Sequence, residues 1–448
     1  MSNLKVGFSR VNVTPALGIG ISGYFIPRIA DGVLDDLYAN AVAFECGERR
    51  AVMICVDNCG FKQEIHEIYR AKIAETTNIP KESVFISCTH THTGPITLIT
   101  SNSEMVQDYI KFLGQKICDA AVLALADLKD AKMGYGVGQA PGIAFVRRFR
   151  MKDGSIKTNP GVDNPDIVAP IGDVDESVNV LRFDREGAET VVVVTFGCHP
   201  DVVGGCKISA DWPGFVRTTV EQAIDNTKCV FFNGAEGDIN HVNVHPTGGF
   251  LNDMFMDFDD VARGYGHARY MGRVVAGGVL QAYDKVKYAD VDEIVAINKV
   301  MNVPSNKPTP EQMPEARRIK QLHDEGRDNE LPYSGMMVTT VVAEALRMVR
   351  LENAPDAFDM TLSGIKIGPV AFVGIPGEPF LGISKGIKEN APFELVMPVC
   401  TANGYEGYFP MRDSYDEGGY EARSSNFKAG VAEFIIEEGK KLLSDLEG

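Results

Sequence analysis

The sequence predicts an α/β fold, with mixed sheets flanked by helices in a single large catalytic domain. Short apolar, strand-sized runs alternate with longer stretches of helical period. Several apolar runs end directly in polar or glycine-rich loops, and α/β proteins gather functional groups at such strand ends. The 448 residues show no internal repeat and no low-complexity linker, so one domain is preferred over two.

The alternation is clearest near the N-terminus. Residues 51–57 (AVMICVD) read as a strand, and 63–77 place their apolar residues on one face, as a helix does. A second strand-like run, 83–88, ends in the polar loop 89–95. A helix is expected to follow from about Glu104 to Leu128, because Gly114 is its only breaker.

The same pattern recurs along the rest of the chain. Helices are expected to begin near Pro213 and to span 428–446. Segment 302–332 is polar and contains proline, which predicts a surface excursion or a lid with a charged helix over 310–325. Three further strand-like runs are each followed by a loop with glycine and polar residues: 190–196, 228–233 and 370–374.

Composition narrows the class of protein. Hydrophobic residues make up 44% and charged residues 23%, as in ordinary globular proteins. The net charge of −17, from 44 Lys and Arg against 61 Asp and Glu, repels nucleic acids and anionic membranes, so neither is an expected partner. We see no secretory signal and no transmembrane segment, and the nine cysteines form no CxxC pair. These features predict a cytoplasmic protein with reduced thiols.

The strongest local signal is the segment 87–95 (SCTHTHTGP). His90 and His92 follow an apolar strand at positions i and i+2, so an extended chain would point both imidazoles to one side. Neutral histidine is the commonest zinc ligand, which favours a metal site here. A pair of solvated loop histidines is the alternative, because the HxH pattern is weak by itself.

Two further strand ends carry candidate ligands. His199, in the sequence TFGCHPD, follows a buried strand, and alone it fits a capping or core histidine slightly better than a ligand. Beside the first motif it becomes a plausible second ligand, because two strand ends can meet at one sheet edge. Glu378, in IPGEP, lies where the chain turns sharply after an apolar run. It is interpreted as a charged turn residue, a carboxylate ligand or a general base. The tyrosine-rich run 401–421 would ordinarily pack as an aromatic loop.

Together these segments resemble the catalytic domain of the neutral (non-lysosomal, alkaline) ceramidase family. The order of the motifs is more specific than any one of them. The resemblance covers most of the chain, 1–448, and rests on these segments: Gly7–Pro15, Thr89–Pro95, Phe196–Pro200, Gly237–Asp238, Pro376–Glu378 and Tyr405–Glu421.

The resemblance implies one Zn²⁺ ion and an amide-cleaving reaction by a zinc-activated water. The implied zinc ligands are His90, His199, Glu378 and Tyr408. The implied catalytic residues are His92, Tyr420 and Arg147, with the Arg147–Arg148 doublet leaving the register of the arginine open. The implied substrate is a small-molecule or lipid N-acyl compound.

The sequence also departs from the family pattern. Asn240 stands where the ceramidases carry a serine, so no mechanism with that serine as nucleophile is available. The chain after Tyr420 is too short for the family's C-terminal immunoglobulin-like domain, which is therefore expected to be missing. Two alternatives remain: hydrolysis of an ester or glycosidic bond in a smaller polar substrate, and a non-catalytic binding protein with the same fold.

Overall fold

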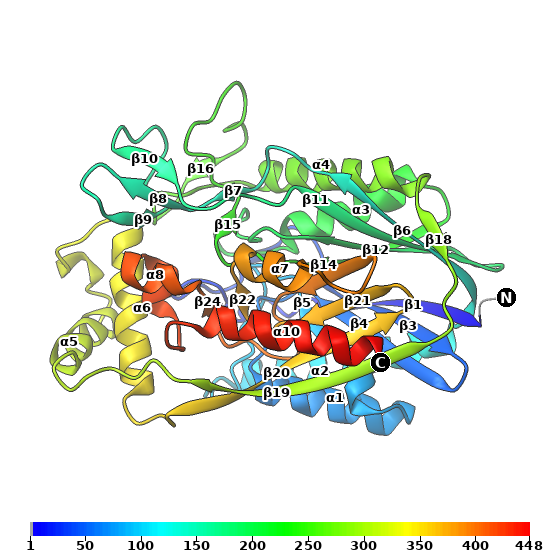
Figure 1. Cartoon of the computed structure of the whole chain (residues 1–448). Coiled ribbons are helices and arrows are strands. Elements are labelled where there is room, and N and C mark those ends of the chain that lie inside the picture. The colour runs from blue at the N-terminus through cyan, green and yellow to red at the C-terminus, as the bar shows by residue number, and fades with distance from the viewer. Residues whose placement is uncertain (1–2) are drawn as a thin grey trace.

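The structure, a computed structural model, describes residues 3–448 and is built around a mixed nine-stranded sheet (Figure 1). Its strands follow the order β14-β12-β11-β6-β1-β3-β4-β5, and β18 pairs with β6. The pairs β4–β5 and β12–β14 are parallel and the others are antiparallel. The strands are β1 (Leu4–Asn12), β3 (Tyr38–Cys46), β4 (Arg49–Val56), β5 (Val84–Cys88), β6 (Lys129–Gln139), β11 (Ser177–Arg185), β12 (Thr190–Phe196), β14 (Thr227–Asn233) and β18 (Lys287–Ala289).

A second sheet has four strands, and short pairs of strands lie around the two sheets. The four strands are β19 (Ile294–Pro304), β20 (Ala357–Ile367), β21 (Val370–Gly374) and β23 (Leu395–Val399). The short strands are β2 (Gly32–Val33) with β13 (Lys207–Ile208), β7 (Phe145–Val146) with β15 (Ile239–Asn240), β16 (Phe255–Met256) with β17 (Ala262–Arg263), β22 (Glu378–Pro379) with β24 (Tyr408–Phe409), and the trio β8 (Arg148–Met151), β9 (Ile156–Thr158) and β10 (Ile167–Pro170).

Helices cover the outer faces of both sheets (Figure 1). One pair packs on β1, β3 and β5, and a second pair packs on β6, β11 and β14: these are α1 (Gln63–Thr77) with α2 (Glu104–Ala126), and α3 (Asp211–Ala223) with α4 (Tyr265–Tyr283). The helix α10 (Val431–Glu447) lies along the four-stranded sheet beside α7 (Leu381–Lys388). The remaining helices are α5 (Met313–Asp324), α6 (Met336–Leu351), α8 (Arg412–Glu417) and α9 (Tyr420–Ser424), with 3₁₀ turns η1 (Lys81–Ser83) and η2 (Asp328–Glu330).

The nine-stranded sheet curves back on itself, so that its two end strands meet. β5 and β14 are the last strands at opposite ends of the order, yet they contact each other. Phe85 of β5 packs edge-on against Phe232 of β14 at 6.3 Å between ring centroids, and Phe372 of β21 lies 6.2 Å from Phe232. A shared apolar core therefore joins both halves of the large sheet to the four-stranded sheet.

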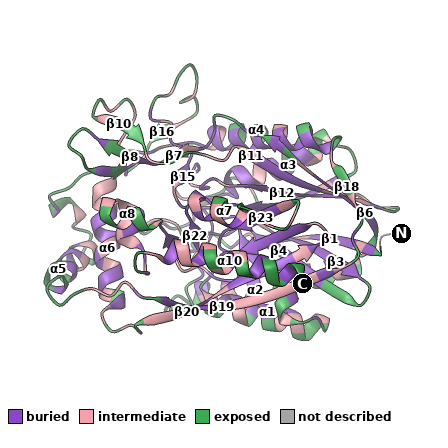
Figure 2. Cartoon of the chain, viewed as in Figure 1, coloured by how far each residue is buried: buried purple, intermediate pink, exposed green. Residues whose placement is uncertain are grey.

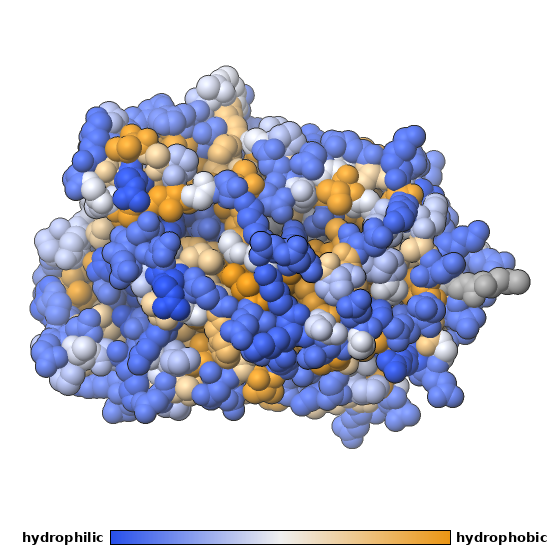
Figure 3. All heavy atoms as spheres, viewed as in Figure 1, coloured by the Kyte–Doolittle hydropathy of each residue, from blue (hydrophilic) through white to orange (hydrophobic). Residues whose placement is uncertain are grey.

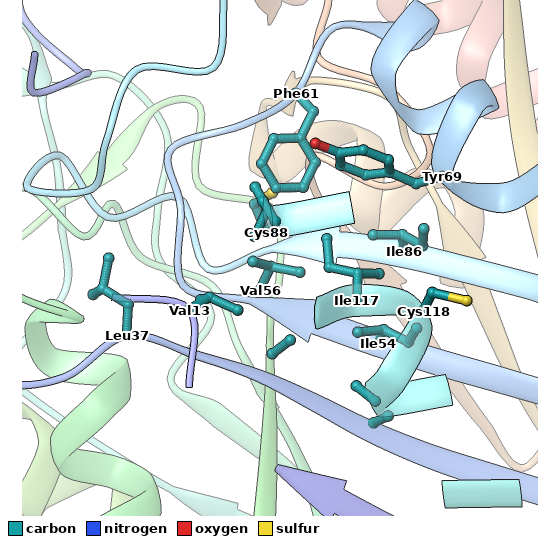
Figure 4. Close-up of a cluster of buried hydrophobic side chains, with 14 of the residues drawn as sticks. Val13, Leu37, Ile54, Val56, Phe61, Tyr69, Ile86, Cys88, Ile117 and Cys118 are labelled. Carbon is teal, nitrogen blue, oxygen red and sulfur yellow. The ribbon is translucent and has the colours of Figure 1, made fainter. Parts of the chain in front are cut away.

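Burial follows this layering (Figure 2). Strands β3, β4, β5, β12 and β14 of the large sheet are buried on both faces over most of their length, because helices cover one face and the shared core covers the other. Beneath α1 and α2, the rings of Phe61 and Tyr69 lie against Cys88 and the aliphatic side chains of β4 and β5 (Figure 4). Because these strands are buried on both faces, their apolar residues follow one another without a break instead of alternating with polar ones.

The predicted α/β class is confirmed, and so are most of the predicted elements. The structure has a helix at 63–77 and strands at 190–196 and 370–374, with the predicted bounds. The segment 302–332 differs in part from the prediction, because its first residues complete β19 rather than a loop. The charged helix is present as α5, which packs against α6.

The face shown in Figure 3 is largely hydrophilic, with apolar atoms scattered between polar groups. All nine cysteines are unpaired thiols, and all except Cys206 are buried. Within residues 3–448, no helix combines the length and the apolar character needed to span a bilayer.

Candidate metal centre

Four strands deliver chemistry-bearing side chains to one place. His90 and His92 follow β5, and His199 follows β12. Glu236 lies in the loop after β14, and Glu378 opens β22 just after β21. The curvature of the large sheet brings the first three strand ends together, and a hydrogen bond of 3.2 Å from Asn233 to the Thr89 carbonyl joins the ends of β14 and β5.

The three imidazole rings meet through their Nε2 atoms. The His92 Nε2 lies 3.3 Å from the His90 Nε2 and 3.0 Å from the His199 Nε2. The rings stand edge to face, with centroids 4.7 to 5.0 Å apart. All three side chains are buried. The predicted convergence of the HxH pair with His199 is therefore present in the structure.

The backbone reason for this convergence differs from the prediction. His90 does not continue an extended strand but has a positive φ of 71°. A left-handed conformation is uncommon for a residue with a side chain and costs about 1–3 kcal/mol. Such strain concentrates at functional sites, and here it turns the chain so that His90 and His92 both face the centre.

The outer nitrogens of two histidines have their own acceptors. The His90 Nδ1 lies 2.6 Å from the Cys59 carbonyl oxygen, and the His199 Nδ1 lies 2.5 Å from Glu236 Oε2. Both contacts favour the tautomer with hydrogen on Nδ1 and leave the Nε2 lone pairs free for a metal. A carboxylate or carbonyl behind a histidine is the usual support of a metal-binding imidazole.

Glu378 supplies a carboxylate to the same centre. Its Oε2 lies 3.5 Å from the His90 Nε2 and 3.9 Å from the His199 Nε2. Its Oε1 accepts a hydrogen bond of 2.9 Å from the hydroxyl of Tyr405. Tyr408 stands opposite Glu378 in the parallel pair β22–β24, and its hydroxyl interacts with Glu378 and with Arg147. Both tyrosines therefore lie next to the candidate ligand carboxylate.

These donors fit a zinc ion. Ligand atoms about 2.1 Å from a tetrahedral ion lie roughly 3.4 Å from each other, close to the distances from Glu378 to the two histidines. The Oε2 of Glu378 is buried, and no donor among the described residues bonds to it. Two imidazoles and a carboxylate form a donor set that zinc commonly uses. His90, His199, Glu236 and Glu378 also form a group compact enough to hold a metal ion.

Arg147 and Tyr420 border the centre. The Arg147 Nε pairs with Glu421 at 2.7 Å, and its guanidinium lies 5.2 Å from the ring centroid of Tyr408. The Tyr420 ring packs edge-on against Tyr408 at 5.4 Å. Arg148 instead bonds Ser414 of α8, so only Arg147 of the doublet is directed toward the centre.

Burial and charge set the protonation of these groups. Burial lowers the pKa of His92 well below its ordinary value, so its ring is neutral. Burial and the charge of Glu378 raise the pKa of the Tyr420 phenol, which keeps its proton. Burial opposes the charge on Arg147, but Tyr408 and Glu421 outweigh that effect and raise its pKa well above the ordinary value.

Residue-by-residue reasoning missed Glu236 and Tyr405. Glu236 lies in the glycine-rich loop after strand 228–233, and Tyr405 lies in the tyrosine-rich run 401–421. The sequence points to both segments, but it does not show which residue of each segment faces the centre. Asn240, at the family's serine position, donates a hydrogen bond of 3.0 Å to Asn159. Its amide is therefore engaged with the loop after β9.

Asp201, which lies just after His199 in the loop that follows β12, also reaches the centre. Its Oδ1 lies 3.5 Å from the His92 Nδ1. Burial would raise the pKa of Asp201, but Arg263 outweighs burial and holds this pKa well below its usual range. Asp57 pairs with Arg217, and Asp238 accepts the backbone N–H of Leu381, so these carboxylates support the fold instead.

A cleft of about 670 Å³ opens beside Tyr420. A smaller hollow of about 240 Å³ adjoins it, since Tyr333 and Gly335 line both spaces. The cleft mixes charged and apolar side chains, including Lys157, Asp260, Met337, Tyr420 and Arg423. The hollow is mostly apolar, with Phe25, Ile26, Phe258, Val338 and Val342.

The fold and the centre define an α/β protein with a buried histidine–glutamate site suited to a divalent transition metal. The fold is that of the neutral ceramidases. The crystal structure of neutral ceramidase from Pseudomonas aeruginosa matches with a TM-score of 0.72 at 18% identity, over 100% of this chain and 75% of that chain. A ceramidase complexed with C2 matches with a TM-score of 0.72 at 16% identity, over 100% of this chain and 76% of that chain. No protein-family model and no curated protein matches the sequence.

Proposed function

We propose that the protein is a zinc-dependent hydrolase that cleaves the amide bond of an N-acyl compound. The observation that carries the proposal is the meeting of the His90 and His199 Nε2 atoms with Glu378 Oε2 in a ceramidase-like fold. Tyr408 is proposed as the fourth ligand. When bound, zinc supplies Lewis-acid chemistry, which makes water nucleophilic near neutral pH and polarises a carbonyl oxygen.

His92 is proposed to move the proton that amide cleavage requires. Because its ring is neutral, its Nε2 can accept a proton from the attacking water and return it to the leaving nitrogen. The Nε2 stands 3.0 and 3.3 Å from the two ligand histidines, so it faces the reacting atoms.

Tyr420 and Arg147 are proposed to stabilise the negative charge that develops on the carbonyl oxygen. Tyr420 keeps its hydroxyl proton and lines the cleft, where it can donate a hydrogen bond. Arg147 keeps its charge on the same side of the centre. Buried donors of this kind act strongly because they are excluded from water and already oriented.

The cleft favours an amphipathic or polar N-acyl compound. Lys157, Asp260 and Arg423 stand beside methionine and tyrosine side chains along its walls. This mixture also supports a second candidate, hydrolysis of an ester or glycosidic bond in a smaller polar substrate. Arg423 is already paired with Glu344, but a purely aliphatic substrate would cover Lys157 and Asp260 without offering them a polar partner.

The test is metal analysis together with a substrate panel on the zinc-reconstituted protein. The panel contains fluorescent short-chain ceramide, N-acyl amino acids, and ester and glycoside reporters. His90→Ala and His199→Ala should each lose bound zinc and activity. His245→Ala, at an exposed histidine, is the matched control and should retain both. Tyr420→Phe should lower kcat by about 10²- to 10³-fold with zinc content unchanged.

Three results would contradict the proposal. Full zinc occupancy in His90→Ala or His199→Ala would remove these residues from the centre. Turnover of esters or glycosides without any amide cleavage would replace the first candidate with the second. Stoichiometric zinc without turnover of any member of the panel would favour a binding protein.

A further inference from the structure

His92 is held by two neighbouring loops, the one that follows His199 and the one that carries Gly23 and Arg28. Its backbone N–H donates to the Pro200 carbonyl at 3.0 Å, and its carbonyl accepts a bond of 2.6 Å from Arg28. Gly23, with a φ of 105°, packs against the ring so closely that a Cβ there would lie 2.7 Å from the His92 Cγ. The ring therefore has little freedom to translate.

One carboxylate faces the outer edge of this ring. The Asp201 Oδ1 lies 3.5 Å from the His92 Nδ1, and this buried nitrogen makes no hydrogen bond in the structure of residues 3–448. Arg263 binds both oxygens of Asp201, with Nε at 3.0 Å and Nη2 at 2.8 Å. The hydroxyl of Tyr24 also donates to Oδ1, and the Tyr24 ring stands edge-on to His92 at 5.6 Å.

We propose that Asp201 is a positioning residue that accepts the Nδ1–H of His92 and so directs the Nε2 atom of that ring toward the centre. Arg263 and Tyr24 hold the carboxylate in place for this contact. A carboxylate behind an imidazole selects the tautomer of the ring and fixes its orientation. The tautomer follows from the geometry alone, whereas its kinetic consequence rests on the proposed function.

The arrangement is not explained by neutralisation of Arg263. Asp259 already binds this guanidinium with two hydrogen bonds, of 2.6 and 2.8 Å. Asp259 makes no contact with His92, whereas Asp201 contacts both groups. Asp257 also approaches this arginine, with Oδ2 at 3.5 Å from Nη1, so its charge is compensated without Asp201. A third carboxylate at one buried arginine is costly to desolvate unless it has further partners, and those of Asp201 are the Tyr24 hydroxyl and His92. Within the described residues, Asp201 makes ion-pair contacts with two groups, Arg263 and His92.

The test measures the tautomer of His92 directly. The zinc-loaded protein is labelled with ¹⁵N-histidine, and its imidazole resonances are assigned to His92 by their loss in His92→Gln. The wild-type ring should carry its hydrogen on Nδ1. In Asp201→Asn the side-chain amide can donate to Nδ1, so the hydrogen should move to Nε2. Asp259→Asn, the matched control on the same arginine, should keep the wild-type tautomer.

Kinetics on the substrate identified by the panel give the second readout. Asp201→Asn should lower kcat by about 10- to 100-fold, with KM within about twofold and zinc content unchanged, since the ring stays in place with its proton on the wrong nitrogen. A wild-type ring with its hydrogen on Nε2 would overturn the inference even if no variant folds. Equal effects of both aspartate variants would overturn it too. An inactive wild-type protein with the Nδ1–H tautomer would instead count against the proposed function.

Discussion

The contact between Glu236 and His199 leads to a quantitative prediction for zinc affinity. Glu236 is buried, with Oε2 at 2.5 Å from the His199 Nδ1. The structure gives this contact as an ion pair, and the prediction takes its imidazole N–H to donate to Oε2 when zinc is bound. A hydrogen bond to a charged acceptor contributes about 1.5–3 kcal/mol, and one to a neutral acceptor about 0.5–1.5 kcal/mol. Glu236→Gln, which keeps an acceptor oxygen, should therefore weaken zinc binding by about 1 kcal/mol, or roughly fivefold. Glu236→Ala should weaken it by about 10- to 100-fold.

The assay is competition for zinc with a chromophoric chelator at pH 7.5, supported by thermal unfolding with and without metal. A 100-fold loss of affinity removes about 2.7 kcal/mol of zinc-dependent stabilisation when zinc is in excess. Asp238→Asn is the control in the same loop, because Asp238 bonds the backbone of Leu381 and contacts no histidine. Unchanged zinc affinity in Glu236→Ala, or an equal loss in the control, would refute the supporting role of Glu236.

Two further predictions concern Tyr408, the proposed fourth ligand, and a buried histidine. Tyr405→Phe removes only a hydrogen bond to Glu378 and should weaken zinc binding by about tenfold. Tyr408→Phe should weaken zinc binding more, because it removes a proposed ligand. If the same competition assay shows the reverse order, Tyr405 is the ligand. Burial, with a smaller effect of Arg70, lowers the pKa of His66 from 6.5 to about 3. Only the unfolded chain then gains this proton between these values, so stability is present above pH 6.5 and falls as the pH drops toward 3. Between pH 7 and pH 5, His66 should lower the free energy of unfolding by about 2 kcal/mol. Urea unfolding at both pH values should show a drop in stability that is smaller by about this amount in His66→Leu than in the wild-type protein. An equal drop in both proteins would contradict the prediction.

The strand ends were the part of the site that the sequence could predict. An apolar run that stops at a histidine or at a proline-flanked glutamate marks a place where the backbone leaves the sheet, and His90, His199 and Glu378 share this signature. Their meeting follows from the curvature of the sheet, which depends on packing between β5 and β14 across more than 100 residues. No local pattern encodes that contact.

Some elements could not be predicted, because their residues are determined by contacts with segments that are distant in the chain. β6 carries Gly134, Gly136 and Gly138, an unusual strand composition. Helix α4 packs closely on this strand: a Cβ at Gly138 would lie 1.9 Å from the Gly278 carbonyl oxygen. Gly138 is therefore needed for this helix–sheet contact, although a glycine is expected to weaken a strand that is considered alone.

The charges of the centre argue that it is built for a cation. Burial would lower the pKa of His90, but Cys59 and Glu378 outweigh burial and raise this pKa well above the ordinary value. Burial would likewise raise the pKa of Glu378, but His90 and His199 outweigh it and lower that pKa. A proton on His90 thus compensates the buried carboxylate when no metal does. Zinc would displace this proton, because a histidine ligand must be neutral at the nitrogen that binds. Proton and metal are therefore alternative partners of the same buried carboxylate, which explains why an acidic side chain is tolerated at the meeting point of four strands.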